Sequence, residues 1–265
     1  AAYLPQVQAK GYDFIYDFDH LGSKQESSYL AVIHTDGNSM GERIKALGRG
    51  FDEPSNNREY IRALRRFSES VQGAAEAALK STVDMLLDLA NLVDGKLGGV
   101  VPIPVHQGVR RLPFRPIVFG GDDVTFVCEG RLGLSTAAKY LAEFSSHVLA
   151  DGRRAHARAG VAIVYNHYPF SRAYSLSEDL VRSAKRYIRQ ADPEGGVSAL
   201  DWHFAVSGLL LPLDELRERE YEVPSGSLLM RPVRLSDPDA DWRSWQTLTR
   251  IMAEFQKPEQ AGGLW

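Results

Sequence analysis

The sequence predicts an α+β fold of the ferredoxin-like palm type, a mostly antiparallel sheet backed by helices on one face. Residues 28–34 (SYLAVIH) form a nearly continuous apolar run, which is typical of a central strand buried on both faces. Apolar runs also flank residues 119–124 (FGGDDV), which predicts a tight hairpin because glycine supplies turn dihedral angles that other residues avoid. The predicted elements follow the order strand, helix, helix, hairpin, helix, strand, helix, strand, which fits this fold.

Local patterns predict the individual elements along the chain. In order, we expect an edge strand or flap over 11–22, a short helix over 42–47, a long helix over 58–93, hairpin arms over 115–119 and 124–128, a helix within 131–150, a strand over 157–165, a helix over 175–190, a strand over 196–206, and helices over 214–221 and 241–255. The long helix carries an apolar stripe at Ile61, Leu64, Phe67, Val71, Ala75 and Leu79. Residues 1–207 are expected to form the palm domain, with 1–27 as an N-terminal flap. A small helical and irregular C-terminal appendage would follow over 208–265.

Composition excludes several classes of protein. The 265 residues are 44% hydrophobic and 25% charged, as in soluble globular proteins with one substantial core. The net charge of -3 gives no overall attraction to nucleic acid, so any such contact must come from local patches. The single cysteine, Cys128, excludes an intramolecular disulfide and a cysteine-rich zinc site. No membrane span or signal peptide is visible, which predicts a cytoplasmic protein. The chain begins Ala1-Ala2 without Met, which leaves open whether it is a piece of something longer.

Three carboxylates are expected to meet at one end of the sheet. Asp122 and Asp123 are adjacent at the hairpin tip, and Asp36 stands where the buried strand meets a helix start. Their mutual repulsion would be relieved by divalent cations, and hard oxygen ligands suit Mg²⁺ or Mn²⁺. Such a site can perform nucleotidyl transfer, in which metal ions activate a 3′-hydroxyl and neutralise triphosphate charge. The alternative readings are a solvated Asp-rich turn for the hairpin and a plain helix N-cap for Asp36.

The segment after Asp36 is suited to bind phosphate. Gly37, Asn38, Ser39, Met40 and Gly41 lead into the predicted helix. Small residues at this position allow backbone N–H groups to approach an anion, and the helix dipole favours the same charge.

Five segments in order resemble a known family. Residues 31–41, 116–130, 160–170, 180–187 and 198–203 are similar to the second Palm domain of the large subunit of type III CRISPR effector complexes, a match that runs from about 29 to 207. The wider superfamily includes diguanylate cyclases with a GGDEF hairpin. The chain departs from those cyclases because Asp123-Val124 replaces Glu-Phe. It also lacks a guanine-reading Asn/Asp pair on the helix after Asp36.

The resemblance implies an activity and a set of site residues. The CRISPR subunit makes cyclic oligoadenylates from ATP through 3′–5′ linkages, with two divalent metal ions. Carried over, Asp36, Asp122 and Asp123 would be catalytic and would bind two Mg²⁺ or Mn²⁺ ions, assisted by the Gly37 carbonyl. The implied nucleotide contacts are Gly37, Asn38, Ser39, Met40, Gly41, Gly120, Gly121 and Lys185. Lys185 is equally well read as a solvated helical lysine. His203, within the matched Asp201-Trp202-His203, is interpreted as a structural histidine rather than a base.

The resemblance also bears on partners and on competing functions. No His-Asp nuclease motif, zinc ribbon or first Palm domain is visible, so we expect a homodimer or a partner palm to hold two ATP molecules. RNA is a possible partner through a larger complex. The leading hypothesis is an ATP-dependent nucleotidyl transferase or cyclase in prokaryotic antiviral signalling. The alternatives are a non-catalytic, nucleotide-binding palm that acts as a sensor or scaffold, and a template-dependent polymerase fragment.

Overall fold

The computed structural model of the chain describes residues 4–21, 28–51, 56–92, 95–205, 211–235 and 242–255. The helices are α1 Pro5–Ala9, α2 Met40–Gly48, α3 Asn57–Leu92, α4 Gly133–Ser146, α5 Phe170–Ala191, α6 Leu213–Tyr221 and α7 Trp245–Phe255, with short 3₁₀ helices η1 Phe18–His20 and η3 Gly130–Leu132. The longer strands are β2 Tyr29–Gly37, β6 Val109–Leu112, β7 Phe114–Gly120, β8 Asp123–Glu129, β9 Ala157–Tyr165 and β10 Ala199–Ala205. The short strands are β1 Tyr12–Phe14, β3 Lys96–Leu97, β4 Val101–Pro102, β5 Val105–His106, β11 Glu222–Val223, β12 Gly226–Ser227 and β13 Val233–Arg234.

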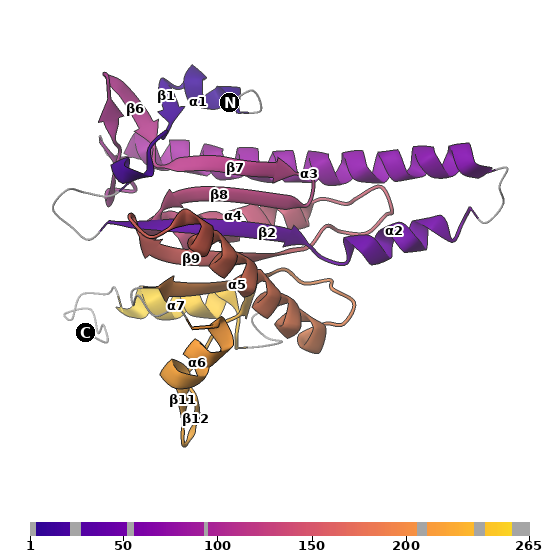
Figure 1. Cartoon of the computed structure of the whole chain (residues 1–265). Coiled ribbons are helices and arrows are strands. Elements are labelled where there is room, and N and C mark those ends of the chain that lie inside the picture. Colours follow the sequence, from indigo (N-terminus) through magenta and orange to yellow (C-terminus); the bar gives the residue numbers. More distant parts are fainter. Residues whose placement is uncertain are drawn as a thin grey trace.

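A six-stranded sheet forms the centre of the molecule, in the order β13-β10-β9-β2-β8-β7 (Figure 1). All neighbouring strands are antiparallel except β9 and β10, which are parallel. The four strands β9-β2-β8-β7 have the order of a ferredoxin-like palm, so the predicted fold class is confirmed. Pro116 lies on β7 at the sheet edge, where the missing backbone N–H breaks no central hydrogen bond.

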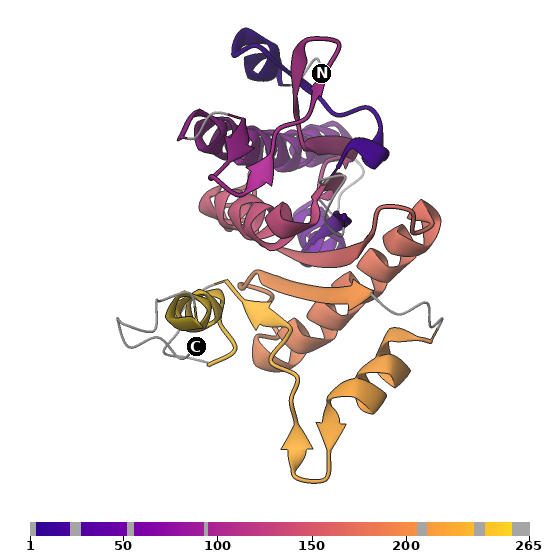
Figure 2. The ribbon, with the colours of Figure 1, turned by 90° about the vertical axis from the view of Figure 1, so that its left-hand side faces the viewer.

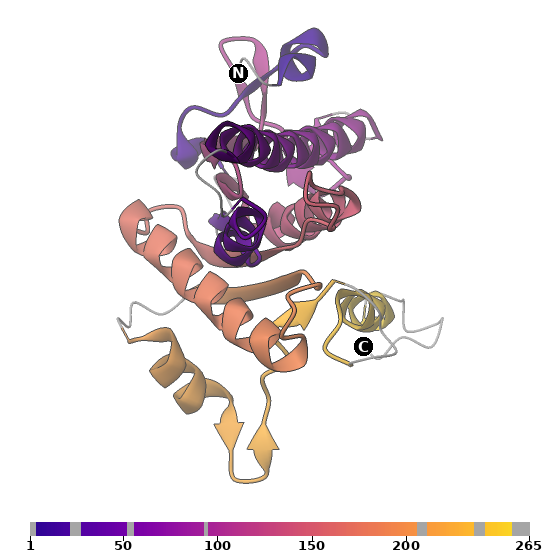
Figure 3. The ribbon, with the colours of Figure 1, turned by 90° about the vertical axis from the view of Figure 1, so that its right-hand side faces the viewer.

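Helices cover both faces of this sheet, whereas the sequence interpretation placed them on one face. Ala31 and Ile33 of β2 point into the core shared with α3 and α4, whereas Leu30 and Val32 point into the core under α5. Figures 2 and 3, which view the molecule from its two sides, show α4 and α5 on opposite sides of the strands. The physical reason is already present in the apolar run of β2, because a strand that is apolar on both faces needs cover on both.

Several element boundaries differ from the expectation. Helix α5 begins at Phe170, directly after Pro169, rather than at Ser175, since proline readily starts a helix. Helix α4 ends at Ser146, before the predicted limit of 150. Ile61, predicted to lie on the apolar stripe of α3, is 60% exposed. The first turns of α3 extend past the ends of the strands, where no sheet remains to cover them (Figure 1).

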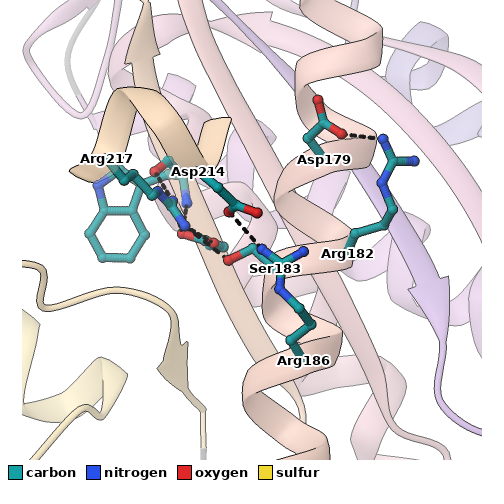
Figure 4. Close-up of polar contacts among 8 residues, drawn as sticks. Asp179, Arg182, Ser183, Arg186, Asp214 and Arg217 are labelled. Carbon is teal, nitrogen blue, oxygen red and sulfur yellow. Dashed lines mark hydrogen bonds and ion pairs between the residues drawn. The ribbon is translucent and has the colours of Figure 1, made fainter. Parts of the chain in front are cut away.

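The N-terminal and C-terminal segments pair with strands of two different sheets. Strand β1 pairs in parallel with β6, in a separate three-stranded sheet with β5. At the other end of the chain, β13 joins the central sheet beside β10, and α6 lies against α5 (Figure 4). Arg217 of α6 donates hydrogen bonds to the fully buried carboxylate of Asp201 and to Ser183. Within the part of the chain that the structure describes, no helix is both long and apolar enough to cross a membrane.

Candidate functional site

A polar cleft of about 460 Å³ opens at the end of β2. Its walls are the β2–α2 connection, the hairpin tip and the C-terminal part of α5. The predicted site residues that line this cleft are Asp36, Gly37, Asn38, Ser39, Met40, Gly41, Asp122 and Lys185, together with the unpredicted Arg158, Arg189 and Asp192. Acidic and basic side chains therefore line the same polar cleft.

The carboxylate of Asp36 is held by an arginine of the neighbouring strand. Asp36 lies opposite Arg158 in the β2–β9 register, so the two side chains emerge on the same face of the sheet. The Arg158 Nε and Nη2 atoms both donate to Oδ2 of Asp36, the Nε contact at 3.0 Å. The Arg158 side chain is only 7% exposed, compared with 36% for that of Asp36. Removing Asp36 would leave the buried charge of Arg158 uncompensated.

Arg158 contacts two further oxygen atoms of the same loop. Its Nη2 donates to the carbonyl of Gly37 at 3.2 Å, and its Nη1 donates to Oδ1 of Asn38 at 3.0 Å. The Gly37 carbonyl and the Asp36 carboxylate are oxygens that the sequence interpretation assigned to a metal ion. In the structure, a guanidinium group contacts both of them.

Asp122 approaches the loop from the hairpin tip. A Cβ atom on Gly37 would lie 2.7 Å from the Cβ of Asp122, so only glycine permits this approach. The tip itself is anchored to α3, because the N–H of Gly121 donates to Oε1 of Gln72 at 3.1 Å. Burial raises the pKa of Asp122 above its ordinary value, and the nearby charges of Asp36 and Asp123 raise it further. A bound cation would offset the repulsion between these carboxylates, and carboxylate and carbonyl oxygens are the donors that Mg²⁺ and Mn²⁺ prefer.

Asp123 points away from the cleft. Its side chain is 51% exposed, and its Oδ1 lies 3.4 Å from Nδ1 of His34. The same His34 nitrogen is 3.0 Å from the hydroxyl of Thr125, on the face of the sheet that α5 covers. Among the described residues, no three acidic, histidine or cysteine side chains converge closely enough to hold a metal ion.

In the loop after β2, fewer backbone N–H groups are free to bind phosphate than the sequence analysis predicts. The N–H of Asn38 donates to the His156 carbonyl at 2.8 Å, and the Asn38 side chain donates to the carbonyl of Val197. Asn38 therefore binds protein rather than an incoming anion. Ser39 has a left-handed φ of 56°, and α2 begins at Met40. The first N–H groups of an α-helix have no partner within the helix, so those of α2 are available at the cleft.

Helix α5 supplies two cations to the opposite wall. Lys185 and Arg189 are four residues apart, so they project from the same side of the helix, and both line the cleft. The helix lies directly on β9, because a Cβ on Gly160 would be 2.1 Å from the Ser177 carbonyl oxygen. This backbone contact sets the height of Lys185 and Arg189 above the sheet.

A second cleft of about 580 Å³ adjoins the first. It lies between α2, α3 and the hairpin tip, and its lining includes Phe67, Val71, Gly120 and Gly121. Asp122 and Met40 line both clefts. The predicted hairpin glycines thus belong to this second space.

A family comparison identifies the domain. The model of the second palm domain of Cas10/Cmr2 matches residues 29–191, more than half of the chain. The chain belongs to the Cas10/Cmr2 second palm domain family. The resemblance on which the sequence interpretation was based is therefore confirmed.

The Cas10-family palm is also similar to solved structures, at low identity. A Csm1–Csm4 cassette in complex with pppApA is 16% identical with a TM-score of 0.42, and covers 92% of this chain and 31% of its own. Csm1 of T. onnurineus is 15% identical with a TM-score of 0.39, over 92% of this chain and 32% of its own. The GGDEF domain of DgcB from Caulobacter crescentus, in complex with c-di-GMP, is 9% identical with a TM-score of 0.31, over 66% and 78%. The chain thus spans about a third of the Csm1 chains that it resembles. No curated protein matches it.

Sequence reasoning missed several residues in or beside this Cas10-family cleft. Arg189 could have been found from its spacing to Lys185, since residues four apart share a helix face. His34 could have been found from its position two residues before Asp36 on the same strand. Arg158 had no local signal, because its role depends on a strand pairing across 122 residues.

His203 of the palm is buried beside Arg231, whose Nη2 lies 3.4 Å from its Nδ1. Burial lowers the pKa of His203 to about 4, with further lowering by the charges of Arg231 and Arg217. His203 lines a separate cleft of about 360 Å³ beside α6, in which none of the predicted acids lies. This environment keeps the imidazole neutral near pH 7.

Proposed function

We propose that this palm domain is a metal-dependent nucleotidyl transferase that joins ATP molecules into cyclic oligoadenylate-type messengers. The observation that carries the proposal is the cleft in which Asp36 and Asp122 face Lys185 and Arg189. A triphosphate needs cations and N–H donors for its oxygens, and a metal needs carboxylates. Both sets are present around one space, in a domain of the Cas10/Cmr2 family.

The reaction assigns a role to each wall. The 3′-hydroxyl of one ATP attacks the α-phosphate of another, a P–O bond forms, and pyrophosphate leaves as the hydroxyl loses its proton. Bound Mg²⁺ or Mn²⁺ would supply Lewis acidity at the hydroxyl and at the phosphates. Asp122 would hold the metal beside Asp36 and the Gly37 carbonyl, and Asp123, whose side chain points toward His34, would have to turn to join them. Lys185, Arg189 and the first N–H groups of α2 would bind the phosphates.

The second cleft suits the adenine base. Phe67 and Val71 provide apolar surface there, while Glu69, Gln72 and Glu76 provide polar groups at its rim. Because Asp122 lines both clefts, a nucleotide with its base against α3 would extend its phosphates toward Lys185. The separation into an apolar and a polar cleft matches the two halves of a nucleotide.

Ring closure requires two ATP molecules to face each other. One cleft of this kind holds one triphosphate, so a second palm, from another copy of the chain or from a partner protein, would hold the other. RNA would act on the domain through a larger complex, and we propose a cytoplasmic location for that assembly.

The proposal is tested by incubating the protein with each nucleoside triphosphate and Mg²⁺ or Mn²⁺, followed by mass spectrometry of the products. We expect linear or cyclic oligoadenylates from ATP, and none from the Asp122→Asn variant. Asp88→Asn is the matched control, because Asp88 is an exposed acid that pairs with Lys10 and lies in neither cleft. Product formation by Asp122→Asn at the wild-type rate would contradict the proposal.

One observation favours a binding-only palm as a second candidate. The charge of Asp36 is already compensated by Arg158, so that carboxylate does not require a metal. A sensor or scaffold would then bind ATP without turnover. Calorimetry with ATP separates the candidates, since ATP binding with no product in the presence of a partner palm favours the sensor.

A further inference from the structure

Arg158 contacts Oδ2 of Asp36 and the Gly37 carbonyl, two of the oxygens that the sequence interpretation assigned to metal ions. We propose that its guanidinium group is a built-in cation that replaces one of two metal ions, so that the cleft binds a single divalent ion. This inference rests on the proposed function, from which it takes the remaining metal ion and the nucleotide. It concerns the cation count, which can be measured without turnover.

The contacts of Arg158 are those expected of a bound cation. Three oxygen atoms converge on the guanidinium: Oδ2 of Asp36, the carbonyl of Gly37, and Oδ1 of Asn38. Asp36 and Gly37 supply the oxygens that would otherwise coordinate a metal ion. Four N–H groups of the side chain are used in these contacts, and a guanidinium has five in all. A metal ion could reach these oxygens only after Arg158 left them.

The position of Arg158 is set by the sheet rather than by a flexible loop. Residues 158 and 36 are direct partners in the β2–β9 ladder, and the adjacent pair is Gly37 with Ala157. The Arg158 side chain is 7% exposed, and a guanidinium stays charged at every physiological pH. If Arg158 moved away from Asp36, its buried positive charge would have no negative partner. Mg²⁺ gives up its hydration water reluctantly, so it is a weak competitor for these oxygens.

The hydrogen bonds of Arg158 do not extend to the second carboxylate, because they go to Asp36, Gly37 and Asn38. Asp122 lines the same cleft and approaches the loop closely at Gly37. Negative charge therefore remains uncompensated at the hairpin tip. One divalent ion satisfies Asp122, while Arg158 satisfies Asp36.

The test counts ions. Mn²⁺ is titrated into the protein by electron paramagnetic resonance, with and without a non-hydrolysable α,β-methylene analogue of ATP. We expect one Mn²⁺ per wild-type chain and two per Arg158→Ser chain, with the second ion bound at least tenfold more tightly than any second ion of the wild type. Arg158→Gln gives a second test if Arg158→Ser does not fold, because the amide can still donate to the Gly37 carbonyl. Arg154→Ser, which removes an exposed arginine of the same segment, is the charge-matched control and should bind one ion.

Two results would overturn the inference: two ions in the wild type, or one ion in both the wild type and a folded Arg158 variant. A wild-type chain that binds no ion would overturn both this inference and the proposed function. Turnover is measured separately on the same samples. One ion without product would contradict only the proposed function, and two ions with product would contradict only the role of Arg158.

Discussion

Gly160 is the point at which the position of α5 can be tested. The glycine lies on β9, where the strand touches the backbone of the helix that carries Lys185 and Arg189. We predict that Gly160→Ala lowers the stability of the fold and weakens ATP turnover together, since the same helix forms part of the core and one wall of the cleft.

The magnitude follows from the distances. The added Cβ would lie 2.1 Å from the Ser177 carbonyl oxygen and 2.8 Å from the Val181 nitrogen, whereas Cβ contacts under 3.0 Å are essentially never seen. The neighbouring atoms are backbone, so α5 as a whole must move outward by about 0.9 Å. Overpacking of this kind costs about 1–3 kcal/mol, which lowers Tm by roughly 2–10 °C in a chain of this size. A displacement near 1 Å of catalytic groups reduces turnover on the order of 100-fold.

The assay is thermal unfolding followed by circular dichroism, with turnover of ATP measured on the same protein. Gly73→Ala is the matched control for stability alone, because Gly73 lines the second cleft. Gly73 lies within α3, and nothing lies within 4 Å of the position of its Cβ. Alanine there should stabilise the helix by about 0.5–1 kcal/mol, because glycine loses more backbone entropy on folding.

An unfolding temperature of Gly160→Ala at or above that of the wild type would refute the reasoning. It would mean that α5 does not rest on β9 at this residue, and that the wall containing Lys185 lies elsewhere. Lowered stability with unchanged turnover would separate the two effects, and would show that α5 does not position phosphate.

Three further predictions concern charge. Asp122→Asn should abolish turnover and raise Tm at pH 8, because the pKa of Asp122 is raised in the folded protein and its charged form is therefore destabilising. This gain in Tm should vanish as the pH falls through the folded pKa to below 3.8. Arg217→Ala should cost about 3–5 kcal/mol in urea unfolding because it strands the buried Asp201, whereas the exposed Arg186→Ala should cost less than about 1 kcal/mol (Figure 4). Wild-type stability should decline as the pH falls from 6.5 to about 4, because the unfolded chain protonates His203 first, and His203→Gln should show a shallower decline.

Each of these has a contrary outcome. A Tm of Asp122→Asn below the wild-type value at pH 8 would show that the carboxylate is stabilising when charged. Equal costs for Arg217→Ala and Arg186→Ala would show that the α6 pair is solvated. Parallel pH profiles of the wild type and His203→Gln would assign the acid instability to other groups.

Much of the fold was predictable because buried segments are recognisable as apolar runs in the local sequence. The apolar runs located β2 and β9, and the glycines between two apolar arms located the β7–β8 hairpin. The same patterns placed Asp36 at a strand end and Asp122 at a hairpin tip. They could not show that β10 runs parallel to β9, or that β13 would complete the sheet from the C-terminal segment.

By itself, the sequence determined the family, the palm fold and the places of Asp36 at a strand end and Asp122 at a hairpin tip, since these depend on backbone preference and on which residues avoid water. Tertiary structure alone decided that Arg158 would hold Asp36, and that Asp123 would turn toward His34 instead of the cleft. It also decided that Asn38 would donate hydrogen bonds to the backbone carbonyls of His156 and Val197. These outcomes depend on strand register and helix docking between residues distant in the chain, and such pairings leave no periodic pattern in the local sequence.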